Sequence, residues 1–310
     1  MEYLNRTADE MLQDLLDAFG AVLIEGPKWC GKTTTAEQIV KSVIKLQDTD
    51  MRDEYLATAA SKPSLLLQGE TPRLIDEWQD APVLWDAVRT MVDKRTVPGQ
   101  FVLTGSNIST LAKKTSMLAD VVASGDMECS IDTFSDYVDA LERLFVIQDI
   151  DAWCPAIRSK TVVRSSPKRG FCDPSIAVAL MGLTPEALSV QLKTFGFIFE
   201  QMCVRDLKAY TQGVYSHVSY YHDRYDLEAD FVLHLEDGRY ALIECKLGSN
   251  EIEEGAKHLL ELKRLIQEHN KTELQVPIRE PDLLIILTGG QMAYTRTDGV
   301  KIIPLGTLKP

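Results

Sequence analysis

The sequence of 310 residues predicts an α/β protein, and two observations carry this prediction. Short apolar runs alternate with helical stretches from the N-terminus to about residue 110, which is typical of parallel βαβ units. The same alternation returns from about residue 191, after a middle part that is mostly helical. At about 100–200 residues per domain, the length predicts two or three domains.

The N-terminal part, residues 1–115, is predicted to be an αβα sandwich with a parallel sheet. Its first helix is expected over Met11–Phe19, because apolar side chains recur there three and four residues apart. Further helices between the strands would cover both faces of the sheet. Four short apolar runs are expected to form the strands: Ala21–Ile24, Val43–Leu46, Arg73–Ile75 and Phe101–Leu103.

The middle part, residues 116–190, is predicted to be a small helical connector. Ile131–Phe145 carries one apolar stripe at helical spacing, so we expect a helix there. Between Ala152 and Cys172 the chain carries five basic residues and no acidic one. Because surface charges are mostly solvated, this stretch predicts a basic loop. The five cations are Arg158, Lys160, Arg164, Lys168 and Arg169.

The C-terminal part, residues 191–310, is predicted to be a second α/β domain. Helices are expected over Phe195–Tyr210 and Glu251–His269, and the second of these is amphipathic. The pair Asp237-Gly238 between two apolar runs indicates a hairpin. The expected strands are Val214–Tyr221, Ala229–Leu235, Tyr240–Leu247 and Leu283–Leu287.

Residues 26–33 read Gly-Pro-Lys-Trp-Cys-Gly-Lys-Thr and match the pattern GxxxxGK[ST] in full. In this pattern a glycine-rich loop between a strand and a helix wraps a phosphate with its backbone N–H groups. Lys32 is expected to reach the β- and γ-phosphate oxygens, and the Thr33 hydroxyl to bind Mg²⁺. The alternative, a plain strand-to-helix turn, is disfavoured by the apolar strand before the loop. The residues expected to bind ATP here are Gly26, Pro27, Lys28, Trp29, Cys30, Gly31, Lys32, Thr33 and Thr34.

Two acidic residues follow the apolar run that ends at Ile75. Asp76 is expected to hold Mg²⁺ together with Thr33. Glu77 is expected to act as the general base on the attacking water, which makes Glu77 and Lys32 the catalytic candidates of this part. Taken alone, an Asp-Glu pair after a strand is equally compatible with a solvated helix cap.

A third group of polar residues follows the predicted strand Phe101–Leu103. Ser106 and Asn107 are expected to lie between the two motif strands and to sense the γ-phosphate of the nucleotide. The alternative for this stretch is a plain Gly-Ser turn.

At these residues the sequence resembles the AAA-type predicted ATPases of bacteria and archaea, which carry a C-terminal domain related to PD-(D/E)xK nucleases. The resemblance rests on GPKWCGKTT, PRLIDEWQDAPVLWDAVR and FVLTGSN, and later on FCDPSIAVALMG, FGFIFEQMCVRDL and YALIECKLG. It covers nearly the whole chain. It implies ATP and Mg²⁺ as ligands, ATP hydrolysis, a winged-helix-like connector and a nuclease-like C-terminal fold. It implies no particular substrate.

Such ATPases usually carry a Gly-Arg element after the TGS strand, and this sequence departs from that pattern. Arg164 and Arg169 are therefore candidates for an arginine finger. The favoured interpretation of both residues is still a solvated basic loop.

In the C-terminal part, the resemblance points to Asp230, Glu244 and Lys246. Glu244 and Lys246 are two residues apart on one predicted strand, so their side chains share a face. A three-residue loop, Glu236–Gly238, would place Asp230 opposite Glu244, whereas a two-residue loop would separate them. Glu200, an acid among apolar residues of a predicted helix, is the expected third acid.

These residues predict a second metal site. Asp230, Glu244 and Glu200 are expected to hold Mg²⁺ or Mn²⁺, with Glu228 as a weaker member. Lys246 is expected to orient water or to stabilise charge on a phosphate. Without the resemblance, this spacing indicates only a solvated strand face, and nuclease activity stays open.

The sequence therefore predicts an ATP-binding protein that hydrolyses MgATP and carries a nuclease-like domain. The alternatives are an ATP-gated binding or scaffold module without catalysis, and a metal-dependent nuclease regulated by ATP. Thirty-three basic against 46 acidic residues give a net charge of −13, which disfavours non-specific coating of nucleic acid. Nucleic acid bound in a local groove, or another protein, is a candidate partner. An oligomer is compatible with the sequence.

The sequence predicts neither a membrane span nor a secretory signal. No apolar run approaches the roughly 18–20 residues that a membrane helix needs. The six cysteines lie far apart and form no CxxC pair, which suits a reducing cytoplasm.

Overall fold

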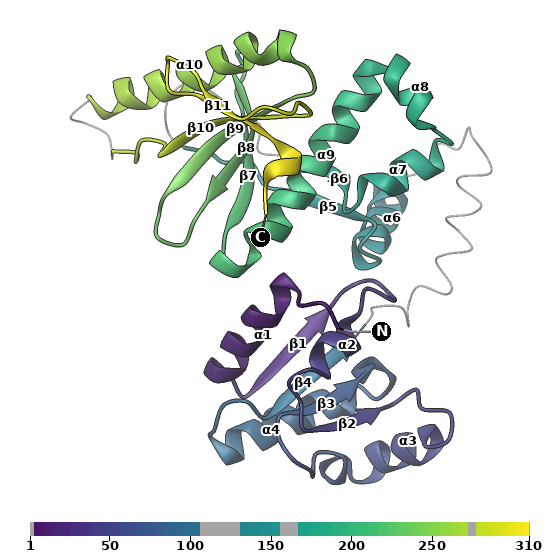
Figure 1. The fold of residues 1–310 in the computed structure, drawn as a ribbon. Helices are drawn as coiled ribbons and strands as arrows, with labels where there is room; N and C mark the ends of the chain where they lie inside the picture. The colour runs from purple at the N-terminus through teal and green to yellow at the C-terminus, as the bar shows by residue number, and fades with distance from the viewer. Residues whose placement is uncertain (1–2, 106–130, 156–166, 272–276, 310) are drawn as a thin grey trace. The chain divides into compact units, whose positions relative to one another are not determined.

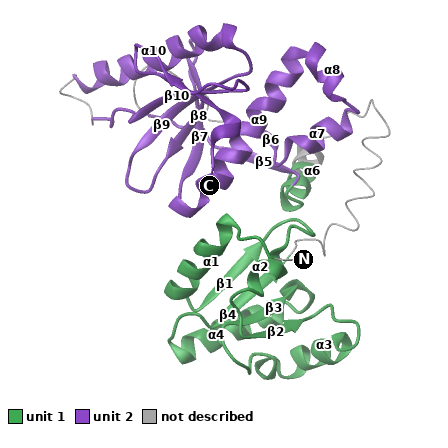
Figure 2. Ribbon diagram, viewed as in Figure 1, with its two compact units in different colours: residues 1–145 green, residues 146–310 purple. Residues whose placement is uncertain are grey.

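The computed structural model describes residues 3–105, 131–155, 167–271 and 277–309. The chain forms two compact units, residues 1–145 and 146–310, and each is described by itself (Figures 1 and 2). Helix α6 (Ile131–Arg143) belongs to the first unit. The division into parts at 1–115, 116–190 and 191–310 stays a prediction, as does the winged-helix-like connector. No helix in the described ranges is long and apolar enough to cross a membrane.

The first unit is built on a four-stranded sheet in the order β1-β4-β3-β2, in which all strands are parallel. The predicted parallel sheet is therefore confirmed. Because β4 lies between β1 and β3, the carboxyl ends of these three strands meet at one edge of the sheet. The strands are β1 (Ala21–Glu25), β2 (Ser42–Lys45), β3 (Arg73–Asp76) and β4 (Phe101–Gly105).

Helices cover both faces of this sheet and complete three layers (Figure 1). Apolar residues of α1 and α2 pack on one face, and those of α3 and α4 pack on the other. The second helix is short, but hydrogen-bonded turns continue it to Val40, whose N–H donates to the carbonyl of Ala36 at 3.2 Å. The helices are α1 (Thr7–Ala18), α2 (Lys32–Ala36), α3 (Arg52–Ser61) and α4 (Val83–Arg95).

The second unit contains a six-stranded mixed sheet in the order β11-β12-β10-β9-β8-β7. Strands β7, β8 and β9 form an antiparallel meander, whereas β9, β10 and β12 run parallel. The sequence patterns predicted four of these strands and missed β11 and β12. The strands are β7 (His217–His222), β8 (Glu228–His234), β9 (Tyr240–Lys246), β10 (Leu283–Thr288), β11 (Tyr294–Thr295) and β12 (Lys301–Pro304).

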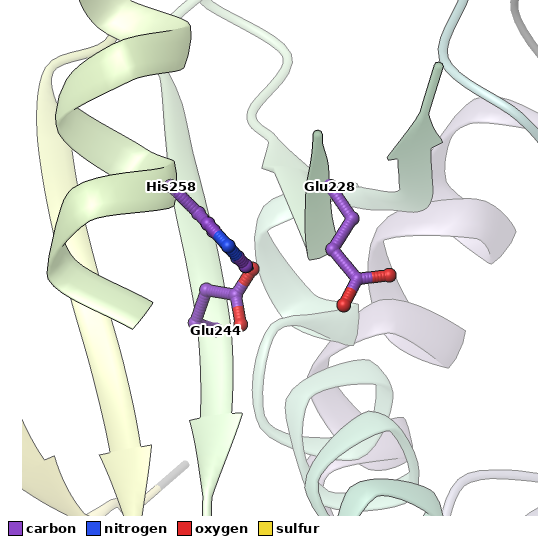
Figure 3. A group of neighbouring side chains, drawn as sticks. All are labelled: Glu228, Glu244 and His258. Carbon is purple, nitrogen blue, oxygen red and sulfur yellow. The ribbon is translucent and has the colours of Figure 1, made fainter. Parts of the chain in front are cut away.

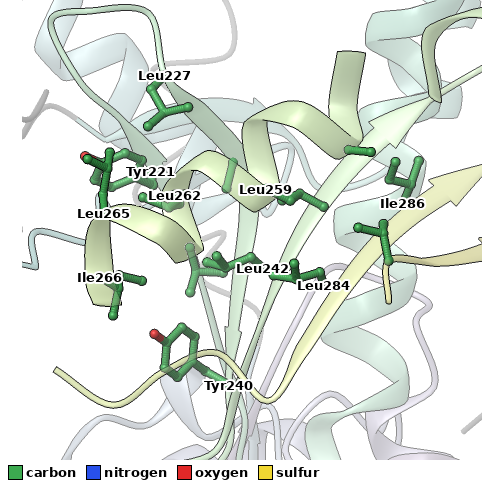
Figure 4. Close-up of a cluster of buried hydrophobic side chains, with 14 of the residues drawn as sticks. Tyr221, Leu227, Tyr240, Leu242, Leu259, Leu262, Leu265, Ile266, Leu284 and Ile286 are labelled. Atoms are coloured by element: carbon green, nitrogen blue, oxygen red, sulfur yellow. The ribbon is translucent and has the colours of Figure 1, made fainter. Parts of the chain in front are cut away.

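Two long helices, α9 (Leu192–Tyr210) and α10 (Ile252–Asn270), pack on opposite faces of this sheet. Alternate residues of β9 face alternate helices, because successive side chains of a strand point to opposite faces. Leu242 belongs to the cluster under α10 (Figure 4), and Ile243 belongs to the cluster under α9. Leu242 and Ile243 are both fully buried, so β9 lies at the centre of the core of the second unit.

The hairpin between β8 and β9 has the register that a three-residue loop predicts. Phe231 lies opposite Ile243, and the N–H of Leu235 donates to the carbonyl of Arg239 at 2.8 Å. Gly238, at the end of the loop, has φ +82°, a conformation that glycine adopts without strain. Continued by one pair, this register sets Asp230 opposite Glu244.

Strands β5 (Ile147–Ile150) and β6 (Lys168–Phe171) form an antiparallel pair in the second unit. The expected basic loop is therefore wrong at its C-terminal end, where the backbone of Lys168 and Arg169 pairs with β5. Arg169 also binds Asp149, with two N–O distances of 2.8 and 2.7 Å. Arg164 lies outside the described residues. Two short helices, α7 (Pro174–Leu180) and α8 (Pro185–Val190), follow β6.

Leu259 on α10 provides a test of the core of the second unit. Its side chain is fully buried in the cluster that contains Leu242 and Ile286. We expect Leu259→Ala to lower the free energy of unfolding by about 2–5 kcal/mol, because the change removes apolar contacts and leaves a cavity. Urea denaturation followed by circular dichroism measures this loss. Leu283→Ala, at a position 41% exposed, is the matched control, and an equal loss in both variants would contradict the packing described.

Candidate functional site

The loop between β1 and α2 needs glycine at two positions. Gly31 has φ +90°, and a Cβ on Gly26 would lie only 3.0 Å from the Sγ of Cys30. Trp29 also adopts a positive φ of 61°, and its side chain is 96% exposed. The loop is therefore held in a tight conformation that directs its largest side chain into solvent.

Lys32 lies inside this loop. Its ammonium group donates to the carbonyl of Gly26 at 2.9 Å and to that of Pro27 at 2.8 Å. Although the side chain carries a charge, the residue is only 7% exposed. The backbone of the loop thus encloses the lysine that the sequence predicts to contact phosphate.

Asp76, at the carboxyl end of β3, joins the loop to the neighbouring strand. Its Oδ1 accepts one hydrogen bond from the Thr33 hydroxyl at 2.6 Å and another from the Thr104 hydroxyl of β4 at 2.5 Å. A hydroxyl and a carboxylate are oxygen ligands of the kind that Mg²⁺ prefers. The pair Thr33 and Asp76 therefore fits the predicted Mg²⁺.

Glu77 follows Asp76 in the left-handed conformation, with φ +58° and ψ +48°. This conformation is unfavourable for residues other than glycine, asparagine and aspartate. The backbone N–H of Glu77 donates to the Thr104 hydroxyl at 3.4 Å, and the side-chain amide of Gln79 donates to its carboxylate. Ser106 and Asn107, the predicted sensors of the γ-phosphate, lie outside the described residues.

Arg6 is a contact of the loop that the sequence patterns did not predict. Its Nη1 donates to the carbonyls of Cys30 and Gly31 at 3.2 and 2.9 Å, and to the hydroxyl of Thr35 at 3.0 Å. The backbone N–H of Arg6 donates to the carboxylate of Asp9 at 2.7 Å, so the segment before α1 is itself held in place. A guanidinium on the outward carbonyls of the loop stabilises their orientation.

In the second unit, Asp230 and Glu244 lie on neighbouring strands but have different partners. The carboxylate of Asp230 accepts a hydrogen bond from the backbone N–H of Cys245 at 2.8 Å. Glu244 is fully buried, and its Oε2 lies 3.2 Å from the Nζ of Lys246. The expected proximity of Glu244 and Lys246, two residues apart on β9, is thus observed.

Burial and neighbouring charges shift the pKa values of Glu244 and Lys246. It raises the pKa of Glu244 to about 7, because the ionised form loses its hydration. Burial alone would lower the pKa of Lys246, but the carboxylates of Glu244 and Asp230 raise it above its usual value. The ammonium form of Lys246 is therefore the stable one at neutral pH.

Glu200, on α9, forms an ion pair with Lys168 of β6. Burial raises the pKa of Glu200, and the nearby charge of Asp230 raises it further. Lys168, Glu200 and Asp230 line one cavity of about 620 Å³ within the second unit. This cavity gives the acidic cluster access from outside the fold.

A different trio of side chains brings its possible ligand atoms close together. Oxygens of Glu228 and Glu244 and a ring nitrogen of His258 all lie within 4.8 Å of one another. Figure 3 shows the three side chains approaching from separate elements, β8, β9 and α10. His258 takes part although the five histidines show no metal-ligand spacing in the sequence, and Glu228 is expected only as a weaker member.

The sequence patterns did not predict two residues that contact this cluster, Lys168 and His258. Lys168 belonged to a stretch of five cations without a single acid, so nothing local indicated its partner Glu200. His258 lies three residues after Gly255 on the amphipathic helix α10. That glycine was the available signal, because a Cβ there would lie 3.1 Å from the Cε of Lys246.

Comparison with protein families matches three stretches of the chain, two of which overlap. Residues 18–129 match a model described as an AAA domain. Residues 195–308 match a domain of unknown function (DUF4143), and residues 101–187 match a second domain of unknown function (DUF8612). None of these descriptions names a nuclease, so the nuclease-like domain stays a prediction.

Over 102 residues the chain is 33% identical to uncharacterized proteins of Mycobacterium bovis and Mycobacterium tuberculosis. The matched region is 33% of this chain and only 23% of each relative. No solved structure matches the chain. The AAA match and the parallel sheet together support an AAA-type P-loop ATPase in the N-terminal part of the protein.

Proposed function

We propose that the first unit binds MgATP in the loop of residues 26–34 and hydrolyses it. The observation that carries this proposal is the pair of hydroxyls, Thr33 and Thr104, that converge on one oxygen of Asp76. They tie the phosphate-binding loop to the ends of β3 and β4. The AAA match over residues 18–129 supports the same activity.

In this proposal each residue has a separate task. The backbone N–H groups of the loop bind the β-phosphate, and the Lys32 ammonium exchanges its loop carbonyls for phosphate oxygens. Thr33 and Asp76 would hold Mg²⁺, which neutralises charge on the phosphates when it is bound. Glu77 accepts a proton from the water that attacks the γ-phosphate in line with the leaving oxygen. Ser106 and Asn107 are proposed to contact the γ-phosphate.

Variants at Lys32 and Glu77 separate binding from hydrolysis. We expect Lys32→Ala to abolish ATP binding, because the charge that faces the phosphates is lost. Glu77→Gln is expected to bind ATP but to release phosphate at least about 100-fold more slowly, because the general base is lost. Titration calorimetry measures binding and a phosphate assay measures turnover.

Lys41→Ala and Glu70→Gln are the matched controls, since both side chains are exposed outside the loop. Normal turnover in Glu77→Gln would contradict the assigned base. Binding of ATP without turnover in the wild-type protein would favour the alternative, an ATP-gated switch or scaffold.

Arg6 gives a second test of the same proposal. We expect Arg6→Ala to raise the Kd for ATP about tenfold, because the loop carbonyls lose a charged donor that holds their amides toward the phosphates. Arg6→Lys should restore part of the affinity. Arg89→Ala, on the exposed side of α4, is the control. An unchanged Kd in Arg6→Ala would show that the loop keeps its conformation without the guanidinium.

A metal-dependent nuclease in the second unit is the second candidate function. It is supported by the hairpin register, which continued by one pair sets Asp230 opposite Glu244, and by the Nζ of Lys246 at 3.2 Å from the Oε2 of Glu244. Asp230, Glu244 and Glu200 would hold Mg²⁺ or Mn²⁺, whose Lewis acidity would activate water or a phosphate. Lys246 would stabilise the charge that develops on the phosphate. Nucleic acid would then be the partner, and ATP turnover with and without DNA or RNA measures the coupling.

Lys246→Ala tests this second candidate. We expect it to slow cleavage of an oligonucleotide by at least about 100-fold, because an ammonium group beside the scissile phosphate is lost. Gel electrophoresis of labelled DNA and RNA, with Mg²⁺ or Mn²⁺ present, measures the rate. Lys257→Ala, exposed on α10, is the control. Absence of any cleavage by the wild-type protein would leave the second unit as a binding module.

A further inference from the structure

The carboxylate of Glu244 is an unusual buried group. The residue has no exposed surface, and neither of its oxygens accepts a hydrogen bond within the described residues. Its nearest charged or basic neighbours are the Nζ of Lys246 at 3.2 Å and the Nδ1 of His258 at 3.6 Å. Because an unsatisfied buried carboxylate is unfavourable, this arrangement points to a further ligand.

The Nδ1 atom of His258 is a second buried polar atom of this kind. Within the part of the chain that the structure describes, it also has no hydrogen-bond partner. Together with Glu228 and Glu244 it offers two carboxylates and one imidazole, with the ligand atoms within 4.8 Å of one another (Figure 3). Metal–ligand bonds of about 2.0–2.2 Å separate neighbouring ligand atoms by about 3–4.4 Å. Small side-chain rotations therefore bring these three atoms to bonding distance.

The charges around the trio suit a divalent cation. Four carboxylates interact here with two ammonium groups, which leaves two negative charges when all six are ionised. Glu200 is already paired with Lys168, and Asp230 accepts the N–H of Cys245. Glu228 and Glu244 are the carboxylates whose oxygens lie within 4.8 Å of the ring nitrogen of His258, so they are the carboxylates of the ligand group.

Helix α10 is positioned to bring its histidine to the sheet. A Cβ on Gly255 would lie 3.1 Å from the Cε of Lys246 and 3.5 Å from the Cβ of Glu244. A larger residue would make an ordinary contact with Glu244 but would have to displace the Lys246 side chain by a few tenths of an ångström. His258 follows three residues later, and residues three apart share a face of a helix.

We propose that Glu228, Glu244 and His258 bind a divalent transition-metal ion. An imidazole nitrogen favours Zn²⁺, whereas Mg²⁺ and Mn²⁺ favour oxygen ligands. This trio shares Glu244 with the set Asp230, Glu244 and Glu200, but Glu228 and a helix histidine take the place of the other two acids. The site requires no nucleotide, so it stands or falls independently of the proposed ATPase.

The test is metal binding by the full chain without nucleotide. The Thr33→Ala variant serves as the background, so that the loop of the first unit contributes no metal ligand. We expect one Zn²⁺ per chain by titration calorimetry, with weaker Mn²⁺ binding and much weaker Mg²⁺ binding. His258→Gln and Glu244→Gln should each lower the Zn²⁺ affinity at least tenfold, since loss of even an outer partner of a ligand costs about 10–100-fold.

Two matched controls should bind Zn²⁺ normally. Glu254→Gln changes an exposed acid one turn earlier on α10, and His217→Gln removes an exposed imidazole from β7. Circular dichroism checks that every variant is folded. If Glu244→Gln fails to fold, His258→Gln on the half-buried face of α10 still decides the question.

A second measurement does not depend on affinity. Zn²⁺ should protect His258 from modification by diethyl pyrocarbonate, as mapped by mass spectrometry, while His217 stays reactive. Protection of His258 together with the loss of affinity in His258→Gln would support the site. Zn²⁺ binding that is unchanged in His258→Gln, or no Zn²⁺ binding in the wild-type chain, would overturn the proposal.

Discussion

A carboxylate that directly follows two buried apolar residues of a strand determines the position of both candidate sites. In β3 two fully buried residues precede Asp76, and in β9 two fully buried residues precede Glu244. Hydrophobic burial fixes these strands, so the acid that follows cannot move away to solvent. Removing an ionised carboxylate from water costs several kcal/mol unless partners replace its hydration. The neighbouring elements therefore have to supply those partners, and their positions shape each site.

The two units supply different partners. Asp76 receives hydroxyl groups from Thr33 and Thr104, which give it short hydrogen bonds in an oxygen-rich environment. Glu244 lies beside the carboxylate of Glu228, an ammonium group and an imidazole, and neither of the two basic groups donates a well-formed hydrogen bond to it. The first arrangement suits a hard cation that travels with a phosphate. The second keeps a carboxylate whose pKa of about 7 reflects its burial.

The parts of the fold that the sequence predicts correctly are those set by local patterns. The loop motif, the apolar strands and the three-residue hairpin that aligns Asp230 with Glu244 depend on neighbours in the chain. The partners Lys168 and His258 could not be predicted in this way, because they reach the cluster from β6 and α10. Their positions follow from how whole elements pack, and the presence of a lysine or a histidine in the sequence does not indicate that packing. The same holds for Arg6, which reaches the loop from the segment before α1.

The left-handed backbone at Glu77 has a consequence for the evolution of this protein. A side chain in this conformation costs about 1–2 kcal/mol relative to an ordinary one, and glycine largely avoids that cost. At position 77, a glycine would therefore give higher thermostability, whereas a carboxylate at this place requires the less stable glutamate. Selection for heat resistance alone would favour glycine or asparagine there, and under the proposed role of Glu77 as general base the resulting chain would be more stable and less active. The proposed role of Glu77 thus implies a stability–activity trade-off at the first residue after β3.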